Sequence, residues 1–399
     1  MKIFILGTGV TGGTLARLLH RRGHRVVCAD RNLERCRAFA STHIPCIQCN
    51  ARKTDSLVRA ARGCDLLVQA APAVLNESAL RAAAHLKVDY LDMASHLARS
   101  PHRAEQFLFA QAFERAGTLA LINAGAAPGL TNVLASLCAE SFDCVDQVRI
   151  RLFEDTESRR PISTWSAEVA FDEAVSPPLV YRHGRFRSVR RFSGAEKFRF
   201  PSPIGEVRVV HLAQDEVATL PIYLPMNTLD VKAGGGDIER LRTWFRRGSL
   251  RGDRAMSEQR FPETPKPEQV QELMRRRILR NAWFAVAVAV TGRSRGRWLE
   301  RRWSCVFPNL RQLQRHRGGS TPVAHATAEC AAAFIRHWPR RTSGVLPPEA
   351  LPAKTRRQII ADLTRKGFRF HRSVRPVEPP PSEATPKEKR IPALSSKAR

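Results

Sequence analysis

The chain begins with the stretch Met1-Lys-Ile-Phe-Ile-Leu-Gly7-Thr8-Gly9-Val10-Thr11-Gly12-Gly13, in which a short apolar run meets glycines at the spacing Gly-x-Gly-x-x-Gly. The pattern predicts a strand over Lys2–Leu6 and a helix over Thr11–Arg22, and a glycine turn between the two is typical of a dinucleotide-binding fold. Gly7 permits the tight turn, Gly9 lets the backbone approach a pyrophosphate, and Gly12 lets the helix pack on the strand. We therefore predict that NAD or NADP binds at this turn.

The ends of later strands supply further cofactor residues. Asp30 ends the second strand, where its carboxylate can bind both ribose hydroxyls and so favour NAD. Arg31 follows and could hold a 2′-phosphate, which keeps NADP open. Small residues and a proline follow the fourth strand, where the ribose and nicotinamide of the cofactor are expected to lie. The predicted cofactor-binding residues are Gly7, Thr8, Gly9, Val10, Thr11, Gly12, Asp30, Arg31, Ala70, Ala71 and Pro72.

The first 125 residues repeat the strand–helix alternation. Apolar runs with little internal alternation indicate strands buried on both faces, as in a parallel sheet covered by helices. Predicted strands are Lys2–Leu6, Arg25–Ala29, Ile44–Gln48, Asp65–Gln69, Val88–Leu91 and Thr118–Ile122. Predicted helices are Thr11–Arg22, Leu33–Ala40, Asp55–Arg62, Glu77–Leu86 and Arg103–Ala116, with Asn76 as a cap before the fourth of these. The fold class is thus α/β, with an N-terminal Rossmann domain whose parallel sheet is doubly wound.

The alternation of strands and helices ends after Pro128. Long β-type runs such as Val145–Phe153 and Glu206–Leu212, and a hairpin formed by Ala285–Thr291 and Arg297–Ser304, predict a mixed sheet in an α+β substrate domain. A late helix, Thr321–His337, is expected to return to the Rossmann domain, with Thr321 as its cap and Pro322 in its first turn. The predicted organisation is residues 1–125 (Rossmann domain), 126–320 (substrate and dimerisation domain), 321–370 (helices packing back) and 371–399 (a disordered basic, Pro-rich tail).

The charge distribution argues against nucleic acid as a partner. The formal net charge is +29, which at first favours a polyanion-binding surface. Much of the excess, however, lies in residues 238–320, with 20 basic and 7 acidic side chains, and in residues 339–399, with 15 and 5. These arginines are scattered singly and in short runs, as on a solvated surface. Nucleic-acid binding by residues 238–320 and 339–399 is kept only as a minor hypothesis.

The same sequence carries no signal for export or for a membrane. The longest apolar run, Ala282–Val290, is about half as long as a bilayer requires. Nine cysteines, an odd number in a long chain, favour reduced thiols and a cytoplasmic protein over a disulfide framework. Cys46 and Cys49 form the single CxxC pair, without a second pair at zinc-binding spacing, so we predict no metal site.

Asp92 is the candidate catalytic residue. It ends the predicted fifth strand in Tyr90-Leu-Asp92, and ligands of open α/β sheets bind at the carboxyl ends of the strands. A structural role, in which the carboxylate caps a nearby turn, explains the same position equally well. His211 and Glu168 are weaker candidates for proton transfer, and His96 and His102 are expected on surface loops.

A second motif, Gly125-Ala-Ala-Pro128-Gly129-Leu-Thr-Asn132, follows the sixth strand and starts a helix, which predicts an anion site beside the nicotinamide. With the glycine turn it resembles the saccharopine dehydrogenase family, including saccharopine reductases and carboxynorspermidine dehydrogenases. Further matching segments cover residues 1–350 in the same order: Thr164-Trp165-Ser166, Ser176–Gly184, Phe200–Gly205, Glu216–Pro221, Lys232–Asp237 and Gly344–Glu349.

The resemblance implies an oxidoreductase that transfers hydride between NAD(P)(H) and the C–N bond of an amino-acid-derived imine or secondary amine. It also implies a homodimer, and a small amino-acid-derived substrate as the partner. The predicted substrate-binding residues are Pro128, Gly129, Asn132, Thr164, Trp165 and Ser166. Donors for the substrate carboxylate are expected at the helix N-terminus, Gly129–Asn132, and in the segment Thr164–Ser166. Trp165 is expected as a flat wall over the nicotinamide or substrate, or alternatively as a core aromatic.

Two departures from the family pattern support an alternative. Lysine-pathway members usually carry an acidic residue before the proline of the Gly-x-x-Pro-Gly loop, whereas this chain has Ala127. Their tyrosine-containing segment after the fourth strand is replaced by Ala73-Val74-Leu75. The alternative hypothesis is a catalytically inactive scaffold of the same fold that binds a dinucleotide.

Overall fold

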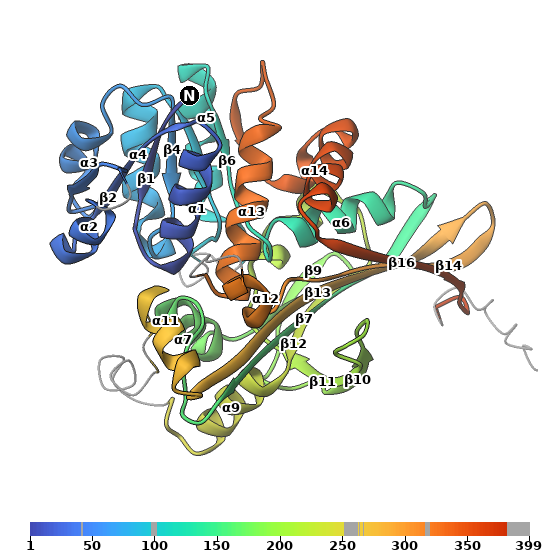
Figure 1. Cartoon of the computed structure of the whole chain (residues 1–399). Helices are drawn as coiled ribbons and strands as arrows, with labels where there is room; N and C mark the ends of the chain where they lie inside the picture. Colours follow the sequence, from blue (N-terminus) through green and yellow to red (C-terminus); the bar gives the residue numbers. More distant parts are fainter. Residues whose placement is uncertain are drawn as a thin grey trace, which may run out of the picture.

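The chain folds around two sheets that lie side by side, with helices between them (Figure 1). The computed structural model describes residues 1–40, 43–96, 102–250, 262, 264–265, 267–315 and 320–380, and every structural statement below concerns these residues. None of their helices is long and apolar enough to cross a membrane.

The first sheet has seven strands, all parallel, in the order β15-β6-β5-β4-β1-β2-β3. The order reverses between β1 and β4, which is the point at which doubly wound sheets bind dinucleotides. The predicted fold class is therefore confirmed. The strands are β1 (Lys2–Leu6), β2 (Arg25–Asp30), β3 (Cys46–Gln48), β4 (Leu66–Gln69), β5 (Asp89–Asp92), β6 (Leu119–Leu121) and β15 (Gly344–Leu346).

Helices cover both faces of this sheet because its strands are apolar on both. In β1, Ile3 and Ile5 belong to the core under α1 and α13, whereas Phe4 and Leu6 belong to the core under α3, α4 and α5. The helices are α1 (Val10–Arg21), α2 (Leu33–Ala40), α3 (Thr54–Ala61), η1 (Ala73–Leu75), α4 (Asn76–Leu86), η2 (Glu105–Phe109), α5 (Ala110–Ala116) and α13 (Pro322–Arg336). The late helix α13 thus lies against α1 (Figure 1).

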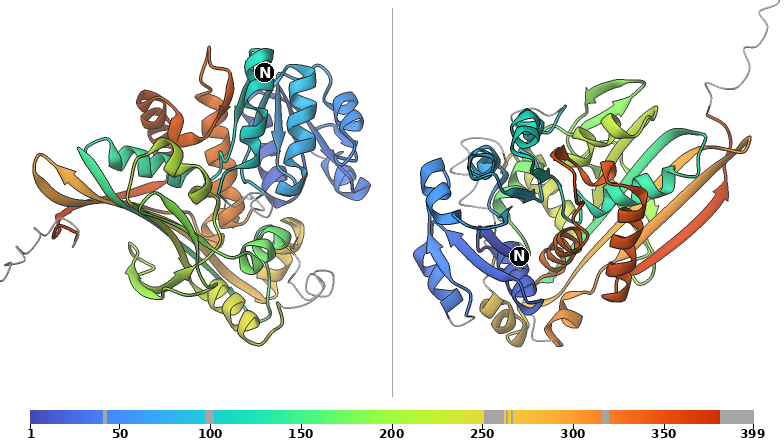
Figure 2. Two further views of the ribbon diagram at one scale, coloured as in Figure 1. Left: turned by 180° about the vertical axis from the view of Figure 1, so that it is seen from behind. Right: turned by 90° about the horizontal axis from the view of Figure 1, so that it is seen from above.

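The second sheet is mixed and contains the longest strands, which extend away from the Rossmann domain (Figure 2). Its order is β10-β11-β12-β7-β13-β14-β16, with β8 beside β12 and β9 beside β8; only β12 and β7 pair in parallel. The strands are β7 (Cys144–Ser158), β8 (Leu179–Arg182), β9 (Arg185–Ser188), β10 (Glu196–Arg199), β11 (Glu206–His211), β12 (Thr228–Gly234), β13 (Leu279–Ser294), β14 (Arg297–Val306) and β16 (Arg369–Pro376).

The remaining helices lie around the second sheet and between it and the Rossmann domain (Figure 1). They are α6 (Leu130–Ala139), α7 (Ala167–Val175), η3 (Asp215–Ala218), α8 (Leu220–Tyr223), α9 (Gly236–Arg246), α11 (Pro267–Arg275), α12 (Leu310–Arg315), η4 (Pro348–Ala350) and α14 (Ala353–Arg365). Alternation along β7 gives the sheet two chemically different faces: Leu152 and Glu154 point to the cleft between the domains, and Arg151 points to the opposite face.

Two sequence-based expectations need correction. The tail does not begin at residue 371, because β16 pairs with β14 over its whole length and Arg372 lies 3.8 Å from the ring centre of Trp303. A strand at the edge of a sheet is held by backbone hydrogen bonds and needs few apolar side chains. The polar composition of β16 therefore gave no sign of a strand. Asn76 does not cap α4: it is the first residue of the helix, and its side chain binds Gln69 and Glu105 in the core. The predicted tail from residue 381 onward lies outside the described residues.

Candidate cofactor and substrate cleft

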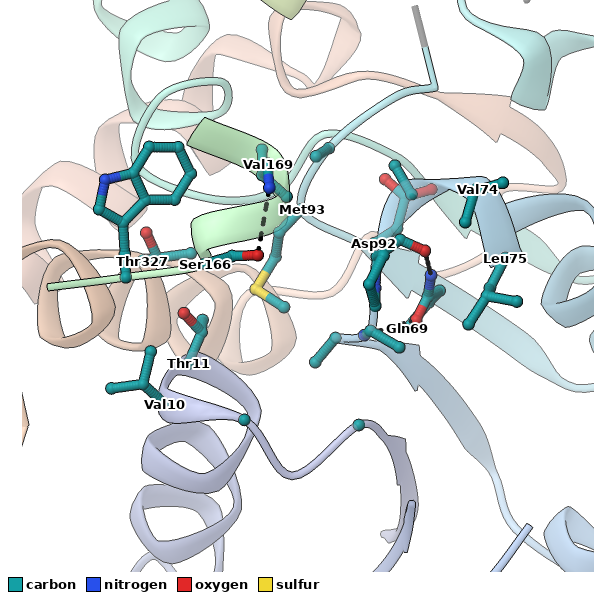
Figure 3. A pocket seen from close by; sticks show the side chains of 18 of the residues that line it. Val10, Thr11, Gln69, Val74, Leu75, Asp92, Met93, Ser166, Val169 and Thr327 are labelled. Carbon is teal, nitrogen blue, oxygen red and sulfur yellow. Dashed lines mark hydrogen bonds between the residues drawn. The ribbon is translucent and has the colours of Figure 1, made fainter. Parts of the chain in front are cut away.

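A cleft of about 1710 Å³ runs between the carboxyl edge of the first sheet and the second domain. Figure 3 shows its middle: Val10 and Thr11 lie at the start of α1, Ser166 and Thr327 lie above them, and Asp92 lies at the end of β5. Carboxyl ends of parallel strands at a reversal of strand order are where open α/β sheets bind ligands. The cleft therefore has the place and the size for a dinucleotide with a second molecule.

The glycine turn leaves space where a cofactor needs it. Gly7 has φ +96°, and a Cβ there would lie 2.7 Å from the Ala71 nitrogen. A Cβ on Gly12 would lie 2.1 Å from the Gly7 oxygen, so this glycine is required for the helix to approach the strand. Gly9, in contrast, faces open space. The geometry fits the predicted pyrophosphate position at Gly9.

Asp30 is held by the turn itself. Its Oδ2 accepts hydrogen bonds from the Thr8 amide at 2.9 Å and the Thr8 hydroxyl at 2.8 Å, and its Oδ1 accepts one from the Asn32 amide at 2.9 Å. Only 6% of the residue is exposed. The structure thus shows Asp30 fixing the glycine turn, and its contact with ribose hydroxyls stays a prediction.

The β2 end of the cleft is basic. Arg31, Arg35 and Arg52 line it next to Asp30, and all three side chains are exposed. In doubly wound sheets this end takes the adenosine half of the cofactor. Exposed guanidinium groups there fit the 2′-phosphate of NADP, since Arg binds phosphate with two parallel hydrogen bonds.

The β4 and β5 ends carry the other predicted residues of the Rossmann side. Ala70, Ala71 and Pro72, which were predicted to bind the cofactor, line the cleft. Asp92 also borders it, but the residue is only 1% exposed. Its carboxylate accepts from the Asn123 amide at 2.7 Å, Gln106 Nε2 at 3.0 Å and the Tyr90 hydroxyl at 3.1 Å. Burial raises the pKa of Asp92 to about 7. Three donors, from β5, η2 and the loop after β6, favour the structural alternative for this residue.

The second domain contributes acidic side chains that the sequence analysis missed. Glu154 from β7, Asp172 and Glu173 from α7, and Asp215 from η3 all line the cleft opposite the Rossmann edge. Burial raises the pKa of Glu154 to about 8 and raises the pKa values of Glu173 and Asp215 well above their ordinary range. Sequence spacing could not reveal this cluster, because its members are up to 61 positions apart and meet only in the folded chain.

The predicted substrate residues divide into two groups. Pro128, Trp165 and Ser166 line the cleft, whereas Gly129, Asn132 and Thr164 do not. Asn132 is 0% exposed: its Oδ1 accepts from the Gly129 amide at 3.0 Å, and its Nδ2 donates to Glu349 Oε2 at 3.0 Å. The expected carboxylate site at this helix end is corrected accordingly.

The backbone explains that correction. The Leu130 amide donates to the Gly125 oxygen at 3.0 Å, and the Thr131 amide donates to the Ala126 oxygen at 3.2 Å. The first amides of α6 are therefore bound to the preceding loop rather than open to a ligand. The Gly-x-x-Pro-Gly motif folds back on its own helix and thereby shapes the wall that Ala127 and Pro128 present to the cleft.

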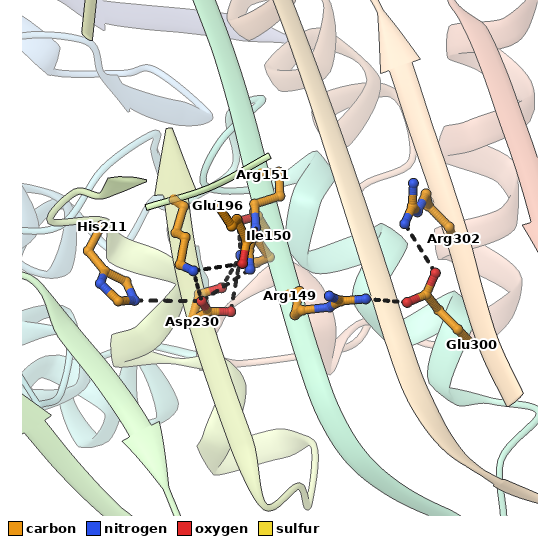
Figure 4. A network of polar contacts seen from close by, with 9 residues as sticks. Arg149, Ile150, Arg151, Glu196, His211, Asp230, Glu300 and Arg302 are labelled. Carbon is orange, nitrogen blue, oxygen red and sulfur yellow. Dashed lines mark hydrogen bonds and ion pairs between the residues drawn. The ribbon is translucent and has the colours of Figure 1, made fainter. Parts of the chain in front are cut away.

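The weaker candidates for proton transfer lie elsewhere. His211 is on the opposite face of the second sheet, where its Nε2 lies 3.6 Å from Asp230, which also binds Arg151 and Lys232 (Figure 4). These partners lower the pKa of Asp230, so the network is a structural ion cluster. The side chain of Glu168 is outside the described part. His96 borders the cleft, and the ring of His102 contacts that of Phe186 at a tilt of 40°, with ring centres 5.2 Å apart.

No group of three or more His, Cys, Asp and Glu side chains in the described part of the chain is arranged to hold a metal ion.

Fold and cleft define a two-domain protein of the Rossmann type that binds NAD or NADP. Residues 3–121 match the family described as saccharopine dehydrogenase NADP binding domain. The resemblance indicated by the sequence motifs is thereby confirmed, as is the predicted cofactor class. Residues 3–121 are thus similar to the NADP-binding domain of saccharopine dehydrogenases.

Individual proteins that are similar to this chain belong to the same family. A carboxynorspermidine synthase of Vibrio alginolyticus is 27% identical over 199 residues, which are 47% of this chain and 48% of that protein. The Vibrio cholerae enzyme of the same name is 24% identical over 266 residues, 59% of this chain and 63% of that protein. The matches thus span about half to two thirds of these relatives. The apo structure of saccharopine dehydrogenase (L-Glu forming) from Saccharomyces cerevisiae shares the fold, with a TM-score of 0.68, 14% identity and coverage of 94% of this chain and 99% of that one.

Proposed function

We propose that this protein is an NAD(P)-dependent oxidoreductase that acts on the C–N bond of an imine or secondary amine. We propose further that this substrate contains an amino-acid-derived part and an amine part, and that the amine part enters the acidic end of the cleft. The cofactor supplies or accepts hydride at its nicotinamide ring when bound. The chain's own tasks are to orient both molecules, exclude water and match charge.

The observation that supports this proposal most is the charge polarity of the cleft. Arginines line the end beside β2, and the carboxyl groups of Glu173 and Asp215 line the opposite wall. A phosphate-bearing cofactor fits the first end, and a substrate ammonium fits the second, since a buried carboxyl with a raised pKa ionises readily beside a cation. The names of the Vibrio relatives, carboxynorspermidine synthase, denote a product with several amine nitrogens and agree with this arrangement.

The residues predicted to touch the substrate have separate tasks in the proposal. Trp165 and Ser166 precede α7 on the second-domain wall, and Pro128 lies on the Rossmann wall opposite. The Ser166 hydroxyl accepts from the Val169 amide at 3.3 Å and so caps α7. Trp165 presents an indole to the cavity, where a flat apolar surface can hold a nicotinamide or an imine and displace water.

The test combines cofactor binding with turnover. The purified protein is titrated with NADPH and NADH, followed by the fluorescence of the reduced cofactor. NADPH oxidation is then measured with an amino-acid semialdehyde mixed with a diamine, and with the same aldehyde mixed with the monoamine of equal length. The proposal expects turnover with the diamine and a KM at least tenfold higher for the monoamine. Absence of dinucleotide binding would refute it.

The inactive scaffold is the second candidate, supported by Ala127 in the Gly-x-x-Pro-Gly loop and by Ala73-Val74-Leu75 after β4. Both segments line the cleft without a titratable side chain. This candidate expects tight cofactor binding and no NADPH oxidation with any aldehyde–amine pair in the screen. Turnover with one such pair decides against it.

A further inference from the structure

Glu154 occupies a rigid position at the wall of the cleft. It lies on β7, between β12 and β13, and its register partner on β13 is Phe284, which also lines the cleft. The residue is 9% exposed. A side chain on the central strand of a sheet is held more precisely than one on a loop, which is what a reacting group requires.

The two oxygens of this carboxyl are in different situations. Oε2 accepts a hydrogen bond from Trp165 Nε1 at 3.0 Å, and the Trp165 carbonyl is in turn bound by the Thr264 hydroxyl. Oε1 has no hydrogen-bond partner among the residues that the structure describes. One oxygen is therefore anchored through a chain of contacts, and the other is available to a molecule in the cavity.

The surroundings keep the carboxyl protonated at neutral pH. Burial is the main cause of its raised pKa, and the negative charge of Asp237 on α9 adds to it. Glu173 on α7 faces Glu154 as well and has Asp215 and Glu216 near it. The Trp165 hydrogen bond acts in the opposite direction. Among the residues that the structure describes, no cationic side chain contributes to the shift, so Glu154 is an acid rather than the anion of an ion pair.

Glu154 lines the same cavity as the strand ends where the reacting half of the cofactor is expected. The adenosine half lies at β2, on one side of the reversal in strand order, so the nicotinamide half extends past the ends of β4, β5 and β6. The Rossmann residues of that half are Ala70–Pro72, Asp92–Ser95 and Ala127–Pro128, and Glu154 lines the same cavity from the second domain.

From these positions we propose that Glu154 is the catalytic residue that donates a proton to the substrate nitrogen. The proposal rests on the function proposed above. In the reductive direction, hydride from the cofactor forms a bond to the imine carbon, and the electron pair of the C=N π bond moves to nitrogen. That nitrogen takes the proton from Glu154, the cofactor becomes NAD(P)+, and solvent reprotonates the carboxylate. In the oxidative direction the carboxylate accepts the proton.

Other acids at this wall are less suited to that step. Asp92 already accepts three hydrogen bonds, and Glu173 is bound to the Gln214 side chain. Asp215 accepts one hydrogen bond from the Ser95 amide at 2.9 Å, but it lies on the short helix η3 rather than on a central strand. These contacts suit groups that hold a substrate or the fold in place. Glu154 combines an anchored oxygen with a free one.

The test measures the pH dependence of kcat in variants that move the pKa in opposite directions. The wild type should lose imine reduction as pH rises through about 8, because the acid form is required. Glu154→Gln should lower kcat at least 100-fold and remove this alkaline limb. Trp165→Phe removes a donor to the carboxylate and should shift the limb to higher pH. Asp237→Asn removes a negative charge outside the cleft and should shift it to lower pH. A merely structural role predicts lower activity with unmoved limbs, which would overturn the proposal.

A second readout does not depend on turnover. Infrared difference spectra of the cofactor-free protein, wild type minus Glu154→Gln, should show a protonated carboxyl band at pH 6.5 that is lost as pH rises through about 8. A carboxylate band at pH 6.5 would overturn the proposal even if Glu154→Gln were inactive. Cofactor affinity of Asp237→Asn, at a residue that does not line the cleft, should stay within twofold of the wild type. If the wild type itself reduces no imine, the proposed function fails, whereas an unchanged limb in active variants contradicts only the role of Glu154.

Discussion

Thr8 holds the Asp30 carboxylate with both its amide, at 2.9 Å, and its hydroxyl, at 2.8 Å. Because these contacts and Asn32 occupy the carboxylate, the exposed Arg31 and Arg35 dominate the surface at the adenosine end. We expect NADPH to bind more tightly than NADH. Arg31→Ala should weaken NADPH binding about tenfold or more, as the loss of one charge-assisted hydrogen bond does, and NADH binding less than twofold. Fluorescence titration measures both.

Arg185→Ala is the matched control, since Arg185 is exposed on β9 and does not line the cleft. It should leave both affinities unchanged. Equal losses of NADPH and NADH affinity in Arg31→Ala would contradict a 2′-phosphate site and favour a contact shared by both cofactors, such as stacking on adenine.

Two glycines of the same turn should respond differently to alanine. A Cβ at Gly12 collides with the Gly7 oxygen at 2.1 Å, whereas a Cβ at Gly9 meets open space. Gly12→Ala should therefore lower the melting temperature and the cofactor affinity together. Gly9→Ala should keep the melting temperature and still lose affinity, because the methyl group occupies the space that the pyrophosphate needs. Thermal unfolding with and without NADPH separates the two outcomes. A Gly9→Ala protein that binds NADPH normally would place the phosphates elsewhere.

The Rossmann domain was predictable because its signals are local. Apolar runs without alternation predicted β1 to β6, and Thr321 lies at the predicted N-terminus of α13 with Pro322 next to it. Pairing partners distant in sequence were not predictable: β15 completes the first sheet beside β6, and β16 pairs with β14 through backbone contacts that leave no side-chain pattern.

The site was predictable on the cofactor side only. The spacing of the glycines predicts the geometry of the turn, and its close approach to Ala70 and Ala71 follows from the fold. On the second-domain side, Glu154 lies one residue past the predicted strand Val145–Phe153, and only the register of β7 shows that it faces the cleft. Asn132 fits a binding motif by sequence, yet its partner Glu349 lies 217 positions away and turns it into a buried structural residue.

Asp92→Asn distinguishes the two roles that the sequence left open for this residue. An amide cannot accept from Asn123, Gln106 and Tyr90 as the carboxylate does, so a buried donor loses its partner. We expect a loss of roughly 1–3 kcal/mol in the free energy of unfolding, with kcat of the folded enzyme within threefold and an unchanged pH profile. Urea unfolding and steady-state kinetics measure these quantities. A dead but fully stable Asp92→Asn protein would instead make Asp92 catalytic.

Glu349 should make stability depend on pH. Burial raises its pKa to about 7, while Asn132 donates to Oε2 and Oε1 has no partner in the described part of the chain. The unfolded chain ionises this carboxyl near pH 4.3, so between that pH and about 7 the folded state binds more protons than the unfolded state. Stability contributed by the protonated form is therefore complete below pH 4.3 and is lost as pH rises through about 7.

Glu349→Gln should remove this dependence of stability on pH and gain roughly 2–4 kcal/mol in the free energy of unfolding relative to the wild type between pH 4.5 and 8. Urea unfolding at four pH values tests the prediction, with Glu206→Gln, at an exposed carboxyl on β11, as the control that should run parallel to the wild type. If the Glu349→Gln curve also runs parallel to the wild type, the carboxyl is ionised in the folded protein and the network around Asn132 must contain a cationic partner.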